Sequence, residues 1–412
     1  MISQNRRLTM KDNQAKYPQL RFKGFTDPWE QRKLGKMGYT FTGLSGKTKE
    51  DFGHGNAKFV TYMNVFSSPV SNSEMVENVE VDSKQHQVEY GDVFFTTSSE
   101  TPQEVGMSSV WLETAENIYL NSFCFGYHPM VEFDPYYLAF MLRSPVIRKK
   151  FMLLAQGISR YNISKNKVME MLVPVPEIVE QQKIGSFFKQ LDDTITLHQR
   201  KLAKLKELKQ GYLQKMFPKN GSKFPQLRFA GFADAWEQRK LGDIVVFLNG
   251  RAYKQAELLD SGKYPVLRVG NFNTNDKWYY SDLELPAKNY ADKGDLLYTW
   301  ATAFGPHIWK GPKVIYHYHI WKVETTSDIS KNFAVHLLDA DQAQMTNSLN
   351  GSTMVHITKG TMENKIVTIP GISEQRNMAR LLDQLDCTIA LHQRKLEKLQ
   401  ELKKGYLQKM FC

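Results

Sequence analysis

The chain contains an internal repeat, and this repeat constrains its fold more than any other feature of the sequence. The segment PQLRFKGFTDPWEQRKLG at 18–35 recurs as PQLRFAGFADAWEQRKLG at 225–242, with 15 of 18 positions identical. The segment LHQRKLAKLKELKQGYLQKMF at 197–217 recurs at 391–411, with 18 of 21 positions identical. Between these segments the two halves differ almost completely. The chain therefore consists of two modules that differ in their interiors and share the segments at their two ends. We call these repeated end segments the frame.

The two interiors predict β-rich domains. Both contain short β-branched and aromatic runs, such as YPVLRVGNF at 264–272, broken by Gly, Asn, Asp and Pro. Gly91-Asp92 before VFFTT matches Gly294-Asp295 before LLYTW, so we expect the interiors to share one mostly β fold. A helix is expected to start at Asp134, because a carboxylate followed by proline caps the free amide groups of a first turn.

The repeated second segments predict long amphipathic helices. Apolar residues recur at alternating intervals of four and three residues, which is a heptad pattern. We expect the two seams to pack on each other as an antiparallel coiled coil; packing of each helix on its own domain is the alternative. A histidine at the same seam position of each helix is interpreted as setting the register rather than binding metal. The predicted seam residues are Ile184, Phe188, Leu191, Ile195, His198, Leu202, Leu205 and Tyr212, and Met378, Leu382, Leu385, Ile389, His392, Leu396, Leu399 and Tyr406.

These observations predict an α+β fold with two β-rich domains separated by two long helices and related by a pseudo-twofold internal repeat. Proline marks each junction between a domain and its helix, because it can neither continue a strand nor lie deep in a helix. The predicted organisation is a polar tail at 1–16, a first domain at 17–176, a helix at 177–217, a linker at 218–224, a second domain at 225–370 and a second helix at 371–412.

Composition narrows the class of protein. The chain is 42% hydrophobic and 24% charged, which is typical of globular proteins, and no run approaches the roughly 18 apolar residues of a membrane span. We therefore expect a cytoplasmic protein without a membrane partner. The net charge of +11 is concentrated in the helices, with +5 over 177–224 and +3 over 371–412. Such a charge permits a nucleic-acid partner.

Motif fragments do not combine into an active site. Gly46-Lys47-Thr48 resembles the end of a phosphate loop, but Phe41 stands where the first glycine is needed. Asp134-Pro135-Tyr136-Tyr137 lacks the second proline of the adenine methyltransferase motif. His317 and His319 alternate on a predicted strand without a third metal ligand, and the three cysteines, Cys124, Cys387 and Cys412, show no metal-binding spacing. No catalytic, cofactor-binding or metal-binding residue is predicted.

The repeated PQLRF and WEQRKLG motifs, the variable β-rich interiors and the repeated proline, Glu-Gln and heptad segments together resemble the specificity subunit of type I restriction-modification enzymes. The resemblance covers essentially the whole chain and is strongest at Pro174–Phe217 and Ile369–Phe411. The second copy departs from the family pattern at Gly371 and at Met378, which replaces Ile184.

The resemblance implies a non-catalytic subunit in which two target recognition domains each read one half of a split, asymmetric DNA sequence. It also implies the partners. These are double-stranded DNA, two modification subunits that methylate adenine with S-adenosylmethionine, and restriction subunits that use ATP and Mg for translocation and cleavage. The alternatives are a divergent DNA methyltransferase acting alone and a coiled-coil adaptor without sequence-specific DNA binding.

Candidate DNA contacts follow from the side chains that suit base edges and phosphates. In the first domain they are Lys47, Thr48, Lys49, Tyr62, Asn64, Ser98, Ser99, Gln103, Arg160, Tyr161 and Asn162. In the second domain they are Arg251, Tyr253, Lys254, Arg268, Asn271, Asn273, Lys277, Trp278, Thr299, Trp300 and His307. Basic helix residues could follow phosphates, contact modification subunits or face solvent; they are Arg200, Lys201, Lys204, Arg394, Lys395 and Lys398.

Overall fold

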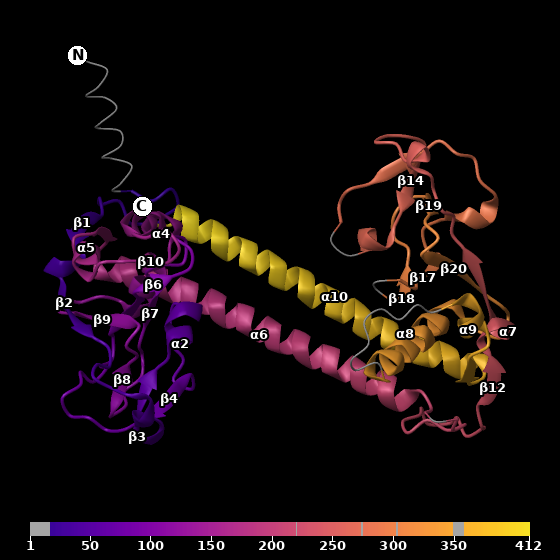
Figure 1. Ribbon diagram of the computed structural model, residues 1–412, viewed down its shortest axis with the longest axis horizontal. Helices are drawn as coiled ribbons and strands as arrows, with labels where there is room; N and C mark the ends of the chain where they lie inside the picture. Colours follow the sequence, from indigo (N-terminus) through magenta and orange to yellow (C-terminus); the bar gives the residue numbers. More distant parts are fainter. Residues whose placement is uncertain (1–16, 220, 273–274, 302–303, 349–357) are drawn as a thin grey trace, which may run out of the picture. The chain divides into compact units, whose positions relative to one another are not determined.

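The computed structural model (Figure 1) describes residues 17–219, 221–272, 275–301, 304–348 and 358–412. The predicted tail at 1–16 and the candidate Asn273 lie outside these residues. Contacts between residues divide the chain into two compact units. Unit 1 comprises the chain up to Gln199 together with Arg394–Cys412, and unit 2 comprises Arg200–Gln393. Each unit therefore contains one β-rich domain and segments of both long helices.

The unit 1 domain is built from short strands connected by short helices and loops. Its main sheet has the order β2-β9-β5-β7, and a second sheet has the order β4-β3-β8. The strands are β1 (Glu30–Lys33), β2 (Gly38–Thr42), β3 (Phe52–Val60), β4 (Val76–Val79), β5 (Val93–Thr96), β6 (Ser98–Ser99), β7 (Ser108–Val110), β8 (Ile118–Leu120), β9 (Cys124–Pro129), β10 (Tyr161–Asn162) and β11 (Leu172–Val175). The helices are η1 (Leu34–Lys36), η2 (Lys49–Asp51), α2 (Tyr62–Ser67), α3 (Pro135–Leu142), α4 (Pro145–Leu154) and α5 (Lys165–Met169).

The unit 2 domain has sheets of the order β13-β20-β17-β18 and β15-β14-β19-β16. Its strands are β12 (Glu237–Lys240), β13 (Val245–Asn249), β14 (Tyr264–Leu267), β15 (Tyr279–Ser281), β16 (Tyr290–Ala291), β17 (Leu296–Thr299), β18 (Gly305–Ile308), β19 (Val314–Tyr316), β20 (Ile320–Thr325) and β21 (Ile366–Ile369). Its helices are α7 (Leu241–Ile244), η3 (Gln255–Glu257), η4 (Val269–Phe272), η5 (Ala287–Asn289), α8 (Lys331–Ser348) and α9 (Lys359–Glu363).

The main sheets of the two domains share one topology, as the interiors predicted. The first main sheet, β2-β9-β5-β7, matches the second, β13-β20-β17-β18, strand for strand along the chain. In both second sheets one pair is parallel, β3 with β8 and β14 with β19. A glycine follows the first strand of each main sheet, Gly43 and Gly250, where a Cβ would collide with the backbone carbonyls of Asn121 and His317. The same close backbone crossing is therefore built into both domains.

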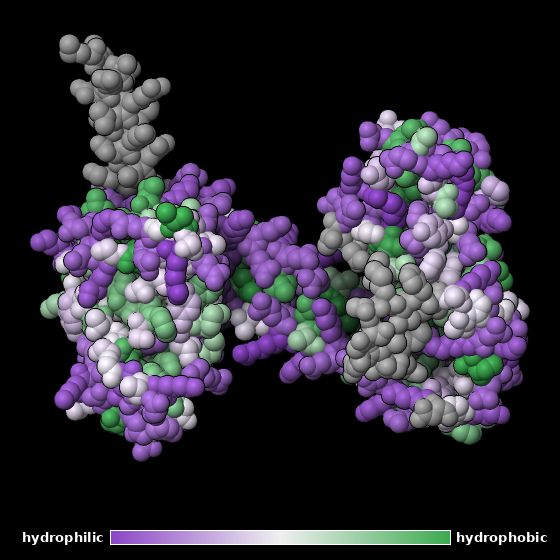
Figure 2. All heavy atoms as spheres, in the orientation of Figure 1, coloured by the Kyte–Doolittle hydropathy of each residue, from purple (hydrophilic) through white to green (hydrophobic). Residues whose placement is uncertain are grey.

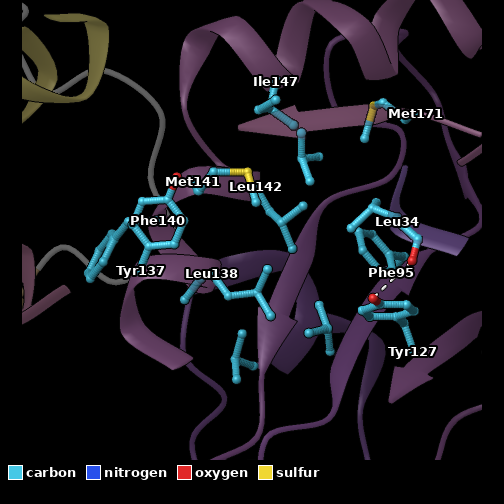
Figure 3. Packing of buried hydrophobic residues seen from close by; sticks show 14 of the residues in the cluster. Leu34, Phe95, Tyr127, Tyr137, Leu138, Phe140, Met141, Leu142, Ile147 and Met171 are labelled. Carbon is cyan, nitrogen blue, oxygen red and sulfur yellow. Dashed lines mark hydrogen bonds between the residues drawn. The ribbon is translucent and has the colours of Figure 1, made fainter. Parts of the chain in front are cut away.

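The core of unit 1 lies between its main sheet and α3 (Figure 3). It includes Met410 and Phe411 from the second repeat. Asp134 caps α3 by accepting a 2.7 Å hydrogen bond from the Tyr137 N–H, and Pro135 occupies the first turn, so the predicted helix start is confirmed. The Tyr127 hydroxyl donates a 3.0 Å hydrogen bond to the Leu34 carbonyl, which satisfies a buried polar atom. Phe411, from the second repeat, is 2% exposed in this core.

The long helices are α6 (Ile178–Met216) and α10 (Ile372–Lys409). In unit 1 the first part of α6 runs antiparallel to the end of α10, with Asp192 2.6 Å from Lys403 and the Phe188 ring 5.7 Å from that of Phe411. In unit 2 the end of α6 runs antiparallel to the start of α10, with Lys209 2.8 Å from Asp386. The predicted antiparallel pairing is confirmed within each unit. Every predicted seam residue is buried or half-buried.

The repeated sequence frame fastens each domain to its helix. The Arg21 guanidinium donates two hydrogen bonds, of 2.7 and 2.8 Å, to the Glu180 carboxylate in the first turn of α6. Arg228 and Glu374 repeat this pair with the same distances at the start of α10. The EQRK segments form matching two-stranded sheets, β1 with β11 and β12 with β21. The two copies of the repeated segment are therefore nearly identical in sequence because both make the same contacts between a domain and its helix.

Candidate nucleic-acid interface

The candidate DNA contacts of the first domain fall in four segments, at 47–49, 62–64, 98–103 and 160–162, and a groove of about 690 Å³ in unit 1 brings together the last three. Its lining comes from α2, from β6 and the turn after it, from the residue before β9 and from the loop before β10. The lining residues are Tyr62, Met63, Phe66, Ser98, Ser99, Glu100, Glu104, Phe123, Ser159 and Arg160. Hydroxyls, carboxylates, a guanidinium and exposed apolar side chains thus meet in one depression, which is the mixture that base edges and thymine methyl groups require.

Local interactions position the groove residues. Thr61 caps α2 by accepting a hydrogen bond from the Asn64 N–H at 3.2 Å, which places Tyr62 in the first turn. The Tyr62 hydroxyl donates to the Ser98 carbonyl at 2.9 Å. Burial raises the pKa of Tyr62, and the carboxylate of Glu104 raises it further. The candidates Tyr161 and Asn162 form β10, which pairs with Ser99 and Ser98 of β6 and so connects two walls of the groove.

Five other candidates in unit 1 have different positions. Asn64 is 1% exposed, and its side-chain amide binds the backbone of the loop at 72–75 through three hydrogen bonds, so its prediction as a DNA contact is corrected. Lys47 lies 3.1 Å from Asp82 in an ion pair, and Thr48 caps the short helix that contains Lys49. This loop does not line the groove. Gln103 is exposed beside the groove.

In unit 2 an aromatic and imidazole strip lies at the loop before β20. The Trp300 ring centroid is 5.1 Å from that of His319, which is 5.0 Å from that of His317. Tyr253 stacks on His317 at 6.4 Å, and the Arg251 guanidinium lies 5.3 Å above the Tyr253 ring. The candidates Arg251, Tyr253 and Trp300 are therefore brought together. For the two histidines of the strip, the sequence favoured a structural or DNA-contact role over metal binding.

Burial and nearby charged groups decide which side chains of this strip carry a charge. Burial lowers the pKa of His317 to about 4, and the nearby His319 and Arg268 lower it as well. Arg251 pairs with Glu257 at 2.7 Å, while the candidate Lys254 is exposed. The strip thus presents a neutral imidazole among rings and cations at neutral pH.

A second part of the unit 2 surface is a cavity of about 1050 Å³ between η4, β18, α8 and α10. Asn271 and His307 line it, and the His307 ring stacks on Phe272 at 4.2 Å. Asn271 binds the backbone carbonyls of Asn275 and Lys277, as Asn64 does for its own loop. Trp278 packs in a hydrophobic cluster with Trp309 and is half-buried, while Lys277 is exposed.

One candidate DNA contact in unit 2, Thr299, is fully buried. Thr299 is 0% exposed, and its hydroxyl is hydrogen-bonded within the fold to the Gly305 carbonyl at 3.3 Å. It has no surface with which to contact a base, so its prediction as a DNA contact is corrected. Arg268 is half-buried and donates to the Lys277 carbonyl at 2.9 Å.

The residues missed by the sequence interpretation are Phe66, Glu104 and Phe123 in the unit 1 groove. Phe123 is 59% exposed, which is unusual for a phenylalanine beside a buried strand. No sequence signal brings these three residues together, because they come from a short helix, a turn and the residue before a strand. Their proximity follows from the sheet order.

The described residues contain no group of three or more His, Cys, Asp and Glu side chains placed to hold a metal ion. In these same residues no helix is both long and apolar enough to cross a membrane. The face shown in Figure 2 is mainly hydrophilic in both units. The six basic helix residues that carry alternative interpretations, Arg200 through Lys398, are all exposed.

The model of the type I restriction modification DNA specificity domain matches residues 26–207 and 233–401 of the chain. The chain belongs to this family of DNA specificity proteins. The two matches correspond to the two modules predicted from the repeat, and the family resemblance deduced from the sequence is confirmed.

Individual relatives agree with this assignment. The chain is 22% identical over 264 residues to the specificity subunit of the type I restriction enzyme MjaVIII from Methanocaldococcus jannaschii, covering 59% of this chain and 62% of that protein. It is 22% identical to the EcoBI specificity subunit of Escherichia coli over 42% of this chain and 37% of that protein. The alignments thus span less than two thirds of these two relatives.

The fold has a solved counterpart. The crystal structure of the type I restriction-modification S subunit from M. genitalium superposes with a TM-score of 0.62 and 14% identity, covering 96% of this chain and 99% of that one. A chain from a structure of a type I restriction-modification system superposes with a TM-score of 0.57 and 17% identity, over 92% of this chain and 96% of that chain. At these identities the likeness concerns the fold.

Proposed function

We propose that the chain is a DNA-recognition subunit that reads a bipartite, asymmetric target, with one half assigned to each unit. The observation that supports this proposal most strongly is that the two domains are alike in their scaffold and different in the surfaces that hold the candidate DNA contacts. The domains share their topology and their attachment to the helices, whereas the groove of unit 1 offers hydroxyls and carboxylates and the strip of unit 2 offers rings and cations. Two scaffolds of one kind with different surfaces suit two different half-sites.

The chemistry belongs to partner subunits in this proposal. Modification subunits bind S-adenosylmethionine and methylate adenine in the recognised sequence, and restriction subunits use ATP and Mg to translocate and cleave DNA. The chain itself positions these subunits and acts in the cytoplasm, where both DNA and the partners are present. Family membership supports this division, because the matched model describes a DNA specificity domain.

The helices set the separation of the half-sites in this proposal. An α-helix rises 1.5 Å per residue, so the 39 residues of α6 span roughly 58 Å. The exposed basic residues on both helices contribute either sequence-independent affinity for spacer phosphates or a surface for the modification subunits. Phosphate contacts would make DNA affinity fall steeply with salt, whereas a protein-docking surface would change complex assembly when it is neutralised.

The test is a map of adenine methylation by single-molecule sequencing. Cells that express the chain with its modification subunit are compared with cells that lack only this chain. A split motif that appears only with the chain supports the proposal and identifies both half-sites. Absence of a new motif, with both proteins soluble and associated, favours the adaptor. Binding of S-adenosylmethionine by the isolated chain in calorimetry would favour a methyltransferase acting alone.

A further inference from the structure

Glu104 holds a carboxylate at a fixed position in the unit 1 groove. Its Oε2 accepts hydrogen bonds from the hydroxyls of Thr101 at 2.8 Å and Ser99 at 3.2 Å. Its backbone N–H donates to the Thr101 carbonyl at 3.2 Å, which closes a turn directly after β6. Among the described residues Oε1 has no hydrogen-bond partner. One oxygen of an oriented carboxylate therefore remains available in a groove of about 690 Å³.

Two half-buried arginines bind the backbone of the segments that line this groove. Arg148 donates to the backbone carbonyls of Gln103 at 2.9 Å, Val105 at 2.5 Å and Gly106 at 2.6 Å, so it binds both neighbours of Glu104. Arg143 donates to the carbonyl of Ser108 and to three carbonyls at the end of α2. The turn that presents Glu104 is thus braced by charge-assisted hydrogen bonds, which are the stronger kind.

The arginines also supply charge. Burial lowers the pKa of Arg143 to about 9 and that of Arg148 to about 10, so both remain positively charged at neutral pH. Neither forms an ion pair with a carboxylate in the described part of the chain, because their donors bind main-chain carbonyls. Because Arg148 binds both neighbours of Glu104, its positive charge lies close to a carboxylate that DNA phosphates would otherwise repel.

A carboxylate in a DNA-reading groove selects a particular base edge. It accepts hydrogen bonds and cannot donate, so it suits the N4 amino group of cytosine in the major groove. Adenine presents its N7 acceptor beside its amino group, and guanine presents two acceptors, so both oppose a carboxylate. The same groove contains the exposed Arg160, whose guanidinium suits the guanine of a C·G pair.

We propose that Glu104 is a specificity-determining residue that accepts a hydrogen bond from the amino group of a cytosine in the half-site read by unit 1. This inference rests on the proposed function, because it assumes that the unit 1 groove faces DNA. Arg143 and Arg148 are positioning residues, which act by fixing the turn that carries Glu104.

The experiment compares the methylation motif of the wild-type chain with that of Glu104→Gln, each with the modification subunit. The glutamine oxygen can still accept from Ser99 and Thr101, and its amide nitrogen then presents only donors, which suit the N7 acceptor of adenine and not the amino group of cytosine. The preference for cytosine over adenine is expected to fall roughly 5- to 100-fold at one position of one half-site, with the other half-site unchanged. Glu104→Asp keeps the charge and shortens the side chain, and it should also weaken the cytosine preference if the glutamine variant does not fold.

Glu113→Gln is the matched control, because Glu113 is an exposed carboxylate of unit 1 that does not line the groove. This change is expected to leave the motif unchanged. The inference is overturned if the wild-type half-sites contain no cytosine that responds to Glu104, if methylation weakens uniformly across motif variants, or if Glu113→Gln changes base preference as Glu104→Gln does. A wild-type chain that produces no motif contradicts the proposed function, whereas an intact motif insensitive to Glu104 contradicts this inference alone.

Discussion

The attachment of each domain to its helix provides a prediction that compares the two copies of the frame directly. Glu180 is 1% exposed and accepts two hydrogen bonds from Arg21 and a third, of 2.9 Å, from the indole N–H of Trp29. Glu374 accepts the same two bonds from Arg228. The equivalent indole, Trp236 Nε1, is buried without a hydrogen-bond partner in the described part of the chain.

Alanine at either glutamate leaves a half-buried arginine unpaired. Removing one partner of a buried ion pair costs about 3–5 kcal/mol, and we expect this range for Glu374→Ala in unit 2. Glu180→Ala should cost unit 1 more by about 1–3 kcal/mol, because it also leaves the Trp29 indole unsatisfied. The ion-pair and cavity contributions are common to both copies, so the difference reports the third hydrogen bond.

The assay is urea titration followed by hydrogen exchange and mass spectrometry, which assigns an unfolding free energy to peptides of each unit separately. A double-mutant cycle supplies the control. In a Trp29→Phe background, Glu180→Ala should lose its extra cost and match Glu374→Ala. Equal costs for the two glutamate substitutions in the wild-type background, or a larger cost for Glu374→Ala, would refute the reasoning.

Three further results are expected. Asn64→Ala should destabilise unit 1 by about 2–3 kcal/mol, because three buried hydrogen bonds to the loop at 72–75 are lost; an unfolding midpoint unchanged in urea would contradict this role. Burial lowers the pKa of His317 to about 4, so the unfolded state binds a proton below pH ~6.5 while the native state does not. The unfolding free energy of unit 2 should therefore fall between pH ~6.5 and about 4, and less so in His317→Asn. The segment 197–217 is nearly identical to 391–411, which packs in the unit 1 core. Two copies of the fragment 1–217 can therefore supply this segment to each other, and light scattering should show a dimer, whereas 1–196 lacks the segment and should remain monomeric.

The frame could be predicted from the sequence because the chain contains it twice. The helix start at Asp134, the heptad seams and the shared topology of the interiors all depend on local or repeated patterns. The residues of the candidate interface were harder to predict from the sequence, because groove residues such as Phe123 and Glu104 meet only through long-range strand pairing. Asn64 was misinterpreted as a DNA contact, because asparagine is found both as a buried residue that binds the backbone and as a residue that binds adenine.

The repeat offset itself carried a signal that would have corrected this interpretation. Asn64 and Asn271 lie 207 residues apart, which is the offset of the first repeated segment, and each binds the loop that follows it. Lys47 and Lys254 have the same offset and precede equivalent short helices. Residues that recur at the offset belong to the frame, and those that read different half-sites are expected among positions that do not recur.

The central claim is that each domain reads its own half-site on an interchangeable frame. The most direct test replaces residues 36–196 with residues 243–390, so that both junctions lie in the repeated segments and the second domain is present twice with its own helix start. Methylation mapping with the modification subunit should then reveal a motif in which the half-site of unit 2 is kept and the other half becomes its inverted repeat. A motif that retains the original unit 1 half-site, or one unrelated to either original half, would contradict the claim.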